Sequence, residues 1–385
     1  GSDIIGNDNQ FTPLWNVGLR WNLHREEFMK RWMWVDQFAV RGGFGYTGSI
    51  DKNALPFVVM TLGQSVIYDG QTVPTSFSYP NPNVKWQTKQ DMNVGLDLSL
   101  FDYRLELGVN YYNNITRDVL DRKALPYSSG RSEVTENVAD IYNSGWEIDL
   151  GVTLLKNKSF QWYAKANIAI NDNKVKNTYY KDTKDLPKAT LSNAHQFVEN
   201  QPVNGWYGYK FAGVNPINGA VMTYTGNGEA TLDMSVSGAT WPIPSVFYLG
   251  NLTPPVVGGF STSANWKQLI FSANFEFKTG HKIKSFNTFR SLDARNRHTS
   301  EANRWREPGD ITNVPAMSEA FTTYSSYMYD ILLEKGNYLR CSYMTLGYNL
   351  KPEWLHKIGF STARLSFTAK DLDRNRHKER SAQEP

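Results

Sequence analysis

Two carboxylates, Glu147 and Asp149, are the residues whose spacing best suits chemistry. They alternate with apolar residues, so they would lie on one face of a β-strand, with Arg104 and Glu106 on a neighbouring strand. Glycoside hydrolysis uses two carboxylates roughly 5–9 Å apart. The same arrangement is common on any strand face that meets water, and no G-x-S-x-G elbow or P-loop accompanies it. The sequence therefore predicts no catalytic residues and no enzymatic activity.

A glycine-rich motif, Gly43–Gly48, matches the G-x-G-x-x-G pattern of dinucleotide sites. Such a site needs a helix N-terminus directly after the glycines to hold the pyrophosphate. Here the following residues, Ser49–Asn53, are typical of a loop, and the glycines alternate with Phe44 and Tyr46 as in a strand. The six histidines show no metal-ligand spacing, and Cys341 is the only cysteine. We therefore expect no cofactor and no metal site.

The composition indicates a large β-rich protein rather than a helical membrane protein or a nucleic-acid binder. Of the 385 residues, 40% are hydrophobic and 14% are aromatic, and aromatic residues favour strands. No apolar run approaches the roughly 18 residues of a membrane-spanning helix. The net charge of +4 is small and is not concentrated in one basic face, so we expect no nucleic-acid partner.

Apolar residues recur at every second position in several segments, which is the pattern of strands with one apolar and one polar face. The repeating segments are about nine to eleven residues long, the length of a tilted membrane strand. Strands of soluble sandwiches are usually shorter, with roughly five or six residues. The clearest alternating segments are 15–23, 94–100, 105–111, 146–154, 160–170 and 269–277.

The connections between these segments alternate between short and long. Residues 101–103, 156–158 and 266–268 are typical of tight turns. Short turns on one side and long loops on the other are the layout of an outer-membrane barrel. The sequence thus predicts an all-β, antiparallel transmembrane sheet of about twelve strands, with no helix longer than Arg25–Trp34. The long polar stretches predicted to be loops are 48–85, 112–142, 172–206 and 278–336.

Charged and amide side chains occupy the polar face of the predicted strands. Burying so many charges in a sandwich core would be prohibitive unless they were paired. On the wall of a water-filled barrel they cost little, so we expect them to line the lumen. These candidate lumen residues are Arg20, Arg41, Asp97, Arg104, Glu106, Glu147, Asp149, Lys165, Asn274 and Glu276.

Aromatic residues near the predicted loop–strand junctions allow two interpretations. Trp206 and Trp241 suit either stacking on a sugar or peptide substrate, or a place in the aromatic girdle at the membrane interface. The girdle is the favoured interpretation for Tyr207 and Tyr209. The candidate substrate-stacking residues are therefore Trp206 and Trp241.

Several stretches resemble the SusC-like family of TonB-dependent outer-membrane transporters. The opening resembles a mid-barrel segment of that family and reads GSDIIGNDNQFTPLWNVGLRWNLHREEFMKR, followed by VDQFAVRGGFGYTGS. Similar hairpins follow in NVGLDLSLFDYRLELGVNYYNNITRDVL, ALPYSSG and NSGWEIDLGV. The late motifs are RWREPGDITNVPAM and GNYLRCSYMTLGYNLKPEWL. The likeness extends over residues 1–372.

The resemblance implies a plugged barrel of about 22 strands that imports oligosaccharides or peptides across the outer membrane of a Gram-negative bacterium. It also implies a SusD-like lipoprotein as partner, contact with outer-membrane lipid, and energy from TonB through an N-terminal plug. No plug or TonB box is recognisable, so we expect a C-terminal barrel portion. Such a portion has unpaired sheet edges, and we expect it not to insert alone as a stable pore.

Two expectations remain beside this interpretation. Residues 373–385 depart from the family pattern and contain no alternation, so they are predicted to form a disordered, unpaired tail. The alternative for the whole chain is a secreted β-sandwich that binds or hydrolyses glycans, motivated by Trp206, Trp241 and the Glu147–Asp149 pair.

Overall fold

The computed structural model describes most of the chain as two compact units of antiparallel strands. The described residues are 11–49, 59–68, 71–78, 84–125, 128, 133–183, 197–225, 227–231, 246–284, 302–316, 329–356, 359–372 and 374–376. One unit comprises residues 1–150 and 171–179, and the other comprises 151–170 and 180–385. Within the described ranges, no helix is long and apolar enough to cross a membrane.

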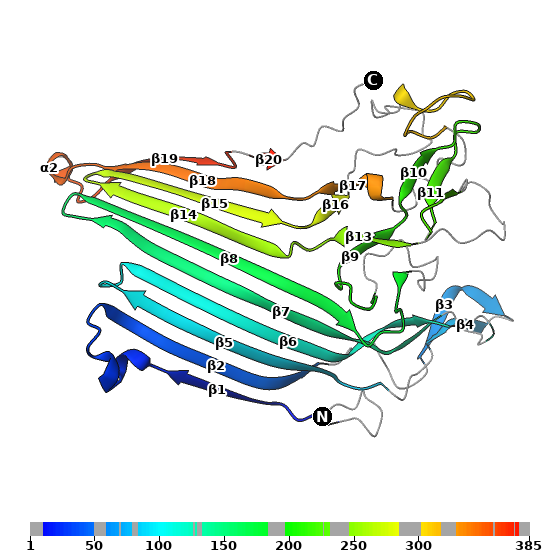
Figure 1. Ribbon diagram of the computed structural model, residues 1–385, viewed down its shortest axis with the longest axis horizontal. Helices are drawn as coiled ribbons and strands as arrows, with labels where there is room; N and C mark the ends of the chain where they lie inside the picture. The colour runs from blue at the N-terminus through cyan, green and yellow to red at the C-terminus, as the bar shows by residue number, and fades with distance from the viewer. Residues whose placement is uncertain are drawn as a thin grey trace. The chain divides into compact units, whose positions relative to one another are not determined.

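The first unit is a sheet in which each strand pairs with the next long strand of the chain (Figure 1). Its strand order is β1-β2-β5-β6-β7, and β1, β2, β5 and β6 pair with one another in antiparallel fashion. A separate hairpin, β3–β4, lies in the connection between β2 and β5. The strand bounds are β1 Trp15–Trp21, β2 Val35–Ser49, β3 Val59–Tyr68, β4 Gln71–Ser78, β5 Gln87–Leu100, β6 Leu105–Ala124 and β7 Glu133–Lys156.

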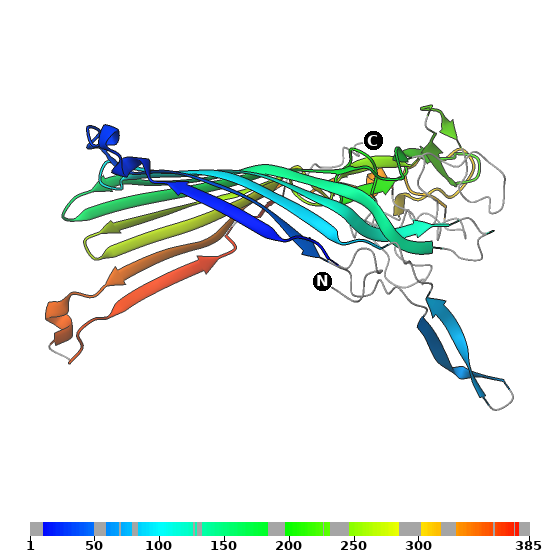
Figure 2. The ribbon, with the colours of Figure 1, turned by 90° about the horizontal axis from the view of Figure 1, so that it is seen from below.

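The second unit continues the same pattern of sequential antiparallel pairs. Its strands follow the order β8-β14-β15-β18-β19. In Figure 2 the strands from β14 to β19 are coloured from yellow-green to red. The short helix α2, Pro352–Leu355, lies in the connection between β18 and β19. The bounds are β8 Phe160–Lys176, β14 Val256–Trp266, β15 Leu269–Thr279, β18 Tyr338–Asn349 and β19 Arg364–Lys370.

The predicted tight turns are confirmed, and local backbone conformation explains two of them. Phe101, Asp102 and Tyr103 take positive φ angles of 59°, 57° and 56°, which reverses the chain between β5 and β6. The carboxylate of Asp36 accepts a hydrogen bond of 2.9 Å from the Tyr103 backbone N–H and holds this turn. Lys267, with φ of 51°, forms the turn between β14 and β15 in the same way.

A small folded region lies between the strands of the second unit. Its core contains Tyr209 and Tyr329, both fully buried, and Tyr207, which is 2% exposed. The interpretation of Tyr207 and Tyr209 as girdle residues is therefore wrong, because these long connections pack a core of their own instead of presenting tyrosines to lipid. The strands of this loop region are β9 Gly205–Gly208, β10 Phe211–Val214, β11 Val221–Tyr224, β12 Ala230–Thr231, β13 Phe247–Asn251, β16 Lys282–Lys284 and β17 Leu333–Lys335.

Two predicted boundaries are corrected by the strand pairing. The stretch 112–142 is mostly strand rather than loop, since β6 and β7 are 20 and 24 residues long. Beyond an apolar band both faces of a strand meet water, so the sequence loses its alternation while the backbone pairing continues. The single helix expected over Arg25–Trp34 is replaced by two 3₁₀ turns, Leu23–Arg25 and Glu27–Met29.

The chain end also differs from expectation. Within the tail predicted to be unpaired, Arg374–Arg376 forms a short strand, β20, that pairs antiparallel with β18. Main-chain groups make these bonds, so an uninformative side-chain pattern does not prevent them. Residues 373 and 377–385 of that tail lie outside the described residues. With β20, the sheet contains eleven strands among the residues described, close to the twelve expected.

Candidate functional site

The strand registers separate an apolar face from a polar face in both units. Residues opposite each other in an antiparallel ladder point to the same side. Val17, Phe44 and Met92 are aligned across β1, β2 and β5, and Leu19 is aligned with Gly42 and Val94. Val17, Leu19, Met92 and Val94 on these rows are exposed, as are Phe260, Leu269, Leu346, Leu365 and Phe367 in the second unit. An extended apolar surface of this kind indicates a non-aqueous environment.

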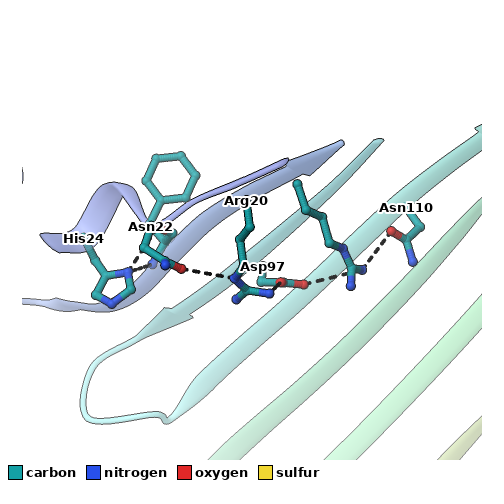
Figure 3. Close-up of polar contacts among 7 residues, drawn as sticks. Arg20, Asn22, His24, Asp97 and Asn110 are labelled. Carbon is teal, nitrogen blue, oxygen red and sulfur yellow. Dashed lines mark hydrogen bonds and ion pairs between the residues drawn. The ribbon is translucent and has the colours of Figure 1, made fainter. Parts of the chain in front are cut away.

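On the polar face of the first unit, ion pairs and hydrogen bonds connect side chains of four strands, β1, β2, β5 and β6 (Figure 3). The carboxylate of Asp97 lies 3.2 Å from Nη1 of Arg20 and 3.6 Å from Nη2 of Arg41. Arg41 also donates to Oδ1 of Asn110 at 2.8 Å, and Arg20 donates from Nε to Oδ1 of Asn22 at 3.1 Å. Two guanidinium groups therefore share one carboxylate, and amides on either side fix their positions.

Gly95 provides the space that these contacts need. A Cβ atom at Gly95 would lie 2.4 Å from Nε of Arg41 and 2.5 Å from Oδ1 of Asn110. The Arg41 side chain thus crosses β5 above Gly95 to reach β6. Sequence reasoning missed both Gly95 and Asn110, although a glycine between charged residues on the polar face was a usable signal.

His24 belongs to the backbone framework beside this network. Its Nδ1 lies 3.3 Å from the Phe38 backbone nitrogen and 3.2 Å from the Phe38 carbonyl oxygen (Figure 3). The ring therefore fastens the 3₁₀ turns to β2. No group of three or more histidine, cysteine or acidic residues able to hold a metal ion occurs in the part of the chain that the structure describes.

The remaining acidic candidates do not form an enclosed site. Glu147 and Asp149 lie two residues apart on β7. Asp149 lies beside β6, because its Cβ would be 3.7 Å from a Cβ atom added at Gly108 of β6. Glu106, Glu147 and Asp149 are all exposed. A general acid for glycoside hydrolysis requires a desolvated carboxyl, which exposed side chains do not provide. Arg104 lies in the turn before β6 and not on a strand face as expected.

The second unit aligns the other candidates on its own polar face. Ser261 of β14 lies opposite both Lys165 and Asn274, so these three residues share one row. Glu276 lies 3.0 Å from Nη2 of Arg340, whose Nη1 lies 3.4 Å from a carboxylate oxygen of Asp371. Here one arginine serves two carboxylates, the reverse of the arrangement around Asp97.

The two candidate stacking residues have different outcomes. The indole Nε1 of Trp206 donates a hydrogen bond of 2.9 Å to the Lys282 carbonyl oxygen, which ties β9 to β16 in the loop region. Its geometry is that of a structural tie, and substrate stacking by its ring remains a prediction. Trp241 lies outside the described residues.

Tyr207 and Tyr248 make the loop region sensitive to alkaline pH. Their ring centroids lie 5.8 Å apart, and burial raises the pKa of both phenols, that of Tyr248 to about 12. A raised pKa means that the folded state prefers the neutral phenol, so the stabilisation is complete below the ordinary pKa of 10 and is lost as pH rises further. We expect a cooperative loss of structure in the loop region between about pH 10 and 12.

Tyrosinate absorbance followed during an alkaline titration measures this effect. Replacing Tyr207 with phenylalanine removes a buried hydroxyl that has no hydrogen-bond partner in the described part of the chain. The loss of structure should then shift to higher pH. An unchanged titration curve in Tyr207→Phe would contradict the assignment.

Comparison with known proteins identifies the family to which this sheet of long strands belongs. Residues 2–276 match the family model described as TonB dependent receptor-like, beta-barrel. The chain belongs to this family. The expected SusC-like TonB-dependent receptor family and the partial antiparallel β-barrel are thereby confirmed. The alternative of a secreted β-sandwich is not supported, because the matched family is a barrel.

Curated relatives are similar over nearly the whole chain. TonB-dependent receptor P3 of Formosa agariphila is 28% identical over 394 residues, which cover 97% of this chain and 38% of the relative. TonB-dependent receptor SusC of Bacteroides thetaiotaomicron is 22% identical, covering 92% of this chain and 36% of SusC. This receptor chain therefore spans about two fifths of the length of the relatives it matches.

A solved structure agrees on the fold. The structure of the RagAB peptide transporter superposes with a TM-score of 0.73 at 24% identity. The match covers 96% of this receptor chain and 41% of the RagAB chain. Sequential antiparallel pairing of long strands is therefore the arrangement that this segment shares with the RagAB chain.

Proposed function

We propose that this chain forms part of the barrel wall of an outer-membrane transporter of a Gram-negative bacterium, and that it performs no chemistry. The observation that carries the proposal is the ladder of long strands, with apolar side chains exposed on one face and ion pairs on the other. Lipid suits the apolar face, and water suits the polar face.

In this arrangement the polar face lines the lumen through which the ligand passes. The strand candidates Arg20, Arg41, Asp97, Glu147 and Asp149 lie on strands of the first unit, and Lys165, Asn274 and Glu276 lie on strands of the second. Arg104 instead lies in the turn between β5 and β6, at one end of the barrel wall. Glu106, the second residue of β6, lies near the same end of the wall.

The imported ligand in this proposal is an oligosaccharide or a peptide. A curated relative is named SusC, and a solved structure with the same fold is a peptide transporter, RagAB. A SusD-like lipoprotein is the proposed partner, and TonB acts through a region of the receptor outside these 385 residues. The strands β6 and β7 continue well beyond the length of a membrane strand. Their extra length supports the proposal that the wall extends outside the membrane, where a lipoprotein would bind.

Cysteine scanning of residues 145–154 on β7 tests the two faces. We expect a water-soluble thiol reagent, applied to the membrane-embedded receptor, to label cysteines at Glu147, Asp149 and Gly151. Cysteines at Ile148, Leu150 and Val152 should stay unlabelled, since lipid excludes the charged reagent.

The background for this scan carries Cys341→Ser, because Cys341 is the one cysteine of these 385 residues and is buried. Cell fractionation provides an independent check, since the receptor should be found with the outer membrane. Equal labelling of both sets of positions would contradict a lipid-facing sheet.

A further inference from the structure

The group of ion pairs around Asp97 contains two positive charges and one negative charge. Arg20 and Arg41 both lie within 4 Å of this single carboxylate, at 3.2 and 3.6 Å. Their side chains are 45% and 40% exposed, and that of Asp97 is 25% exposed. Two fixed positive charges and one negative charge therefore meet water on the polar face.

The charges on β1, β2 and β5 close to this group do not cancel the excess, and the further carboxylates Glu147 and Asp149 belong to β7 on the far side of β6 and are exposed to water. Lys89 and Asp91 of β5 form their own pair at 2.5 Å. The contrast with the second unit is direct, because Arg340 there is shared by Glu276 and Asp371 and that group carries excess negative charge. The excess positive charge is therefore confined to β1, β2 and β5, and the acidic side chains of β7 lie one strand beyond β6.

The two guanidinium groups also retain hydrogen-bond donors. An arginine has five N–H groups. In the described part of the chain, Arg20 uses Nε for Asn22 and Nη1 for Asp97, and Arg41 uses Nη2 for Asn110 and Asp97. Among the described residues, the remaining N–H groups of these two half-exposed side chains are left for a ligand. Guanidinium groups match carboxylates with paired hydrogen bonds.

The site is held in place before any ligand arrives. Asn22 and Asn110 fix the two guanidinium groups from opposite sides. Gly95 of β5 lies between Arg41 and Asn110 in the same row and has no side chain that would block their contact. A fixed arrangement lowers the entropic cost of binding. Preorganisation of this kind distinguishes a binding group from arginines that move freely in solvent.

We propose that Arg20 and Arg41 form a subsite for carboxylate groups of the imported ligand, an inference that rests on the transport function proposed above. Asp97 orients both guanidinium groups and at the same time competes with the ligand for them. Two sources offer this chemistry, an oligosaccharide that contains uronic acids and an acidic peptide.

Equilibrium binding to the purified receptor in detergent tests the subsite. The probes are an oligogalacturonate with its neutral methyl ester, and a glutamate-rich peptide with its glutamine-containing counterpart. We expect Arg20→Gln/Arg41→Gln to weaken binding of a charged probe about tenfold, the range of a charge-assisted hydrogen bond, and to leave the neutral analogue unchanged. Arg364→Gln, which removes an exposed arginine bound to Asn349, is the matched control and should change neither.

Asp97→Asn separates a binding role from a structural one. This substitution removes the competing carboxylate but keeps a polar side chain of the same shape. The affinity for the charged probe should then rise several-fold, because the ligand gains roughly one charge-assisted hydrogen bond. A merely structural ion pair predicts weaker binding in this variant as well. Equal or weaker binding by Asp97→Asn, equal binding by the double variant, or no binding of either charged probe to the wild-type receptor overturns the subsite.

The identity of the bound probe distinguishes the two sources. Oligogalacturonate alone indicates an acidic oligosaccharide, the peptide alone indicates an acidic peptide, and binding of both indicates a general carboxylate subsite. Failure of the transport function is measured separately, as uptake that does not change when TonB is removed from the cells. Charge-selective binding with TonB-independent uptake would retain the subsite and reject the transporter.

Discussion

Replacing Val94 with arginine is expected to destabilise the barrel by roughly 2–4 kcal/mol, the cost of a cation on the lipid face near the bilayer midplane. Val94 is 43% exposed on the apolar face, where it is aligned with Leu19, Gly42 and Tyr111. The arginine would remove favourable burial in lipid and add a charge without water or a partner.

Asn93→Arg is the matched control for this substitution. Asn93 is the adjacent residue on β5 and points to the opposite, polar face, where it is aligned with Gly43 and Tyr112. The free energy of unfolding in urea, measured for the receptor folded into lipid vesicles, should fall for Val94→Arg and stay within about 1 kcal/mol for Asn93→Arg. Equal losses in the two variants would contradict the assignment of faces.

Tyr209→Ala is expected to destabilise the loop region by about 3–5 kcal/mol, the usual cost of deleting a buried aromatic ring. Tyr209 is fully buried and packs against Tyr329 with ring centroids 5.9 Å apart. Its neighbours in the core, Val221 and Leu332, come from distant parts of the chain. Removal of the ring leaves a cavity that these side chains cannot fill.

Limited proteolysis with mass spectrometry measures this second effect. Cleavage within 205–251 should accelerate strongly in Tyr209→Ala, while the barrel strands remain protected. Tyr224→Ala is the control, because Tyr224 is 37% exposed and should be tolerated. If both variants are cleaved at the wild-type rate, the loop region has no cooperative core.

Several features follow from local sequence. Alternating residues on β1, β5 and β15 indicate strands and identify the apolar face, because side chains alternate strictly along a strand. Tight turns such as Phe101–Tyr103 are recognisable because two alternating segments leave only a few residues between them. The family resemblance depended on the same local motifs and was confirmed over residues 2–276.

Other features were beyond sequence reasoning because they depend on neighbours far apart in the chain. The polar ends of β6 and β7 were predicted to be loop, since both faces meet water there and no alternation remains. The strand β20 was missed because its pairing with β18 uses main-chain groups alone. In both cases the backbone partner, and not the side-chain pattern, makes the strand.

Sequence by itself determined that this protein is a sheet of alternating strands with charged residues on one face. Only the tertiary structure decided which polar side chains meet, because Arg41 and Asn110 are 69 residues apart and touch across Gly95. It likewise decided that Tyr207 and Tyr209 are buried in a loop core and do not face lipid. Strand order and register set these contacts, and a strand's local pattern specifies its faces but not its neighbours.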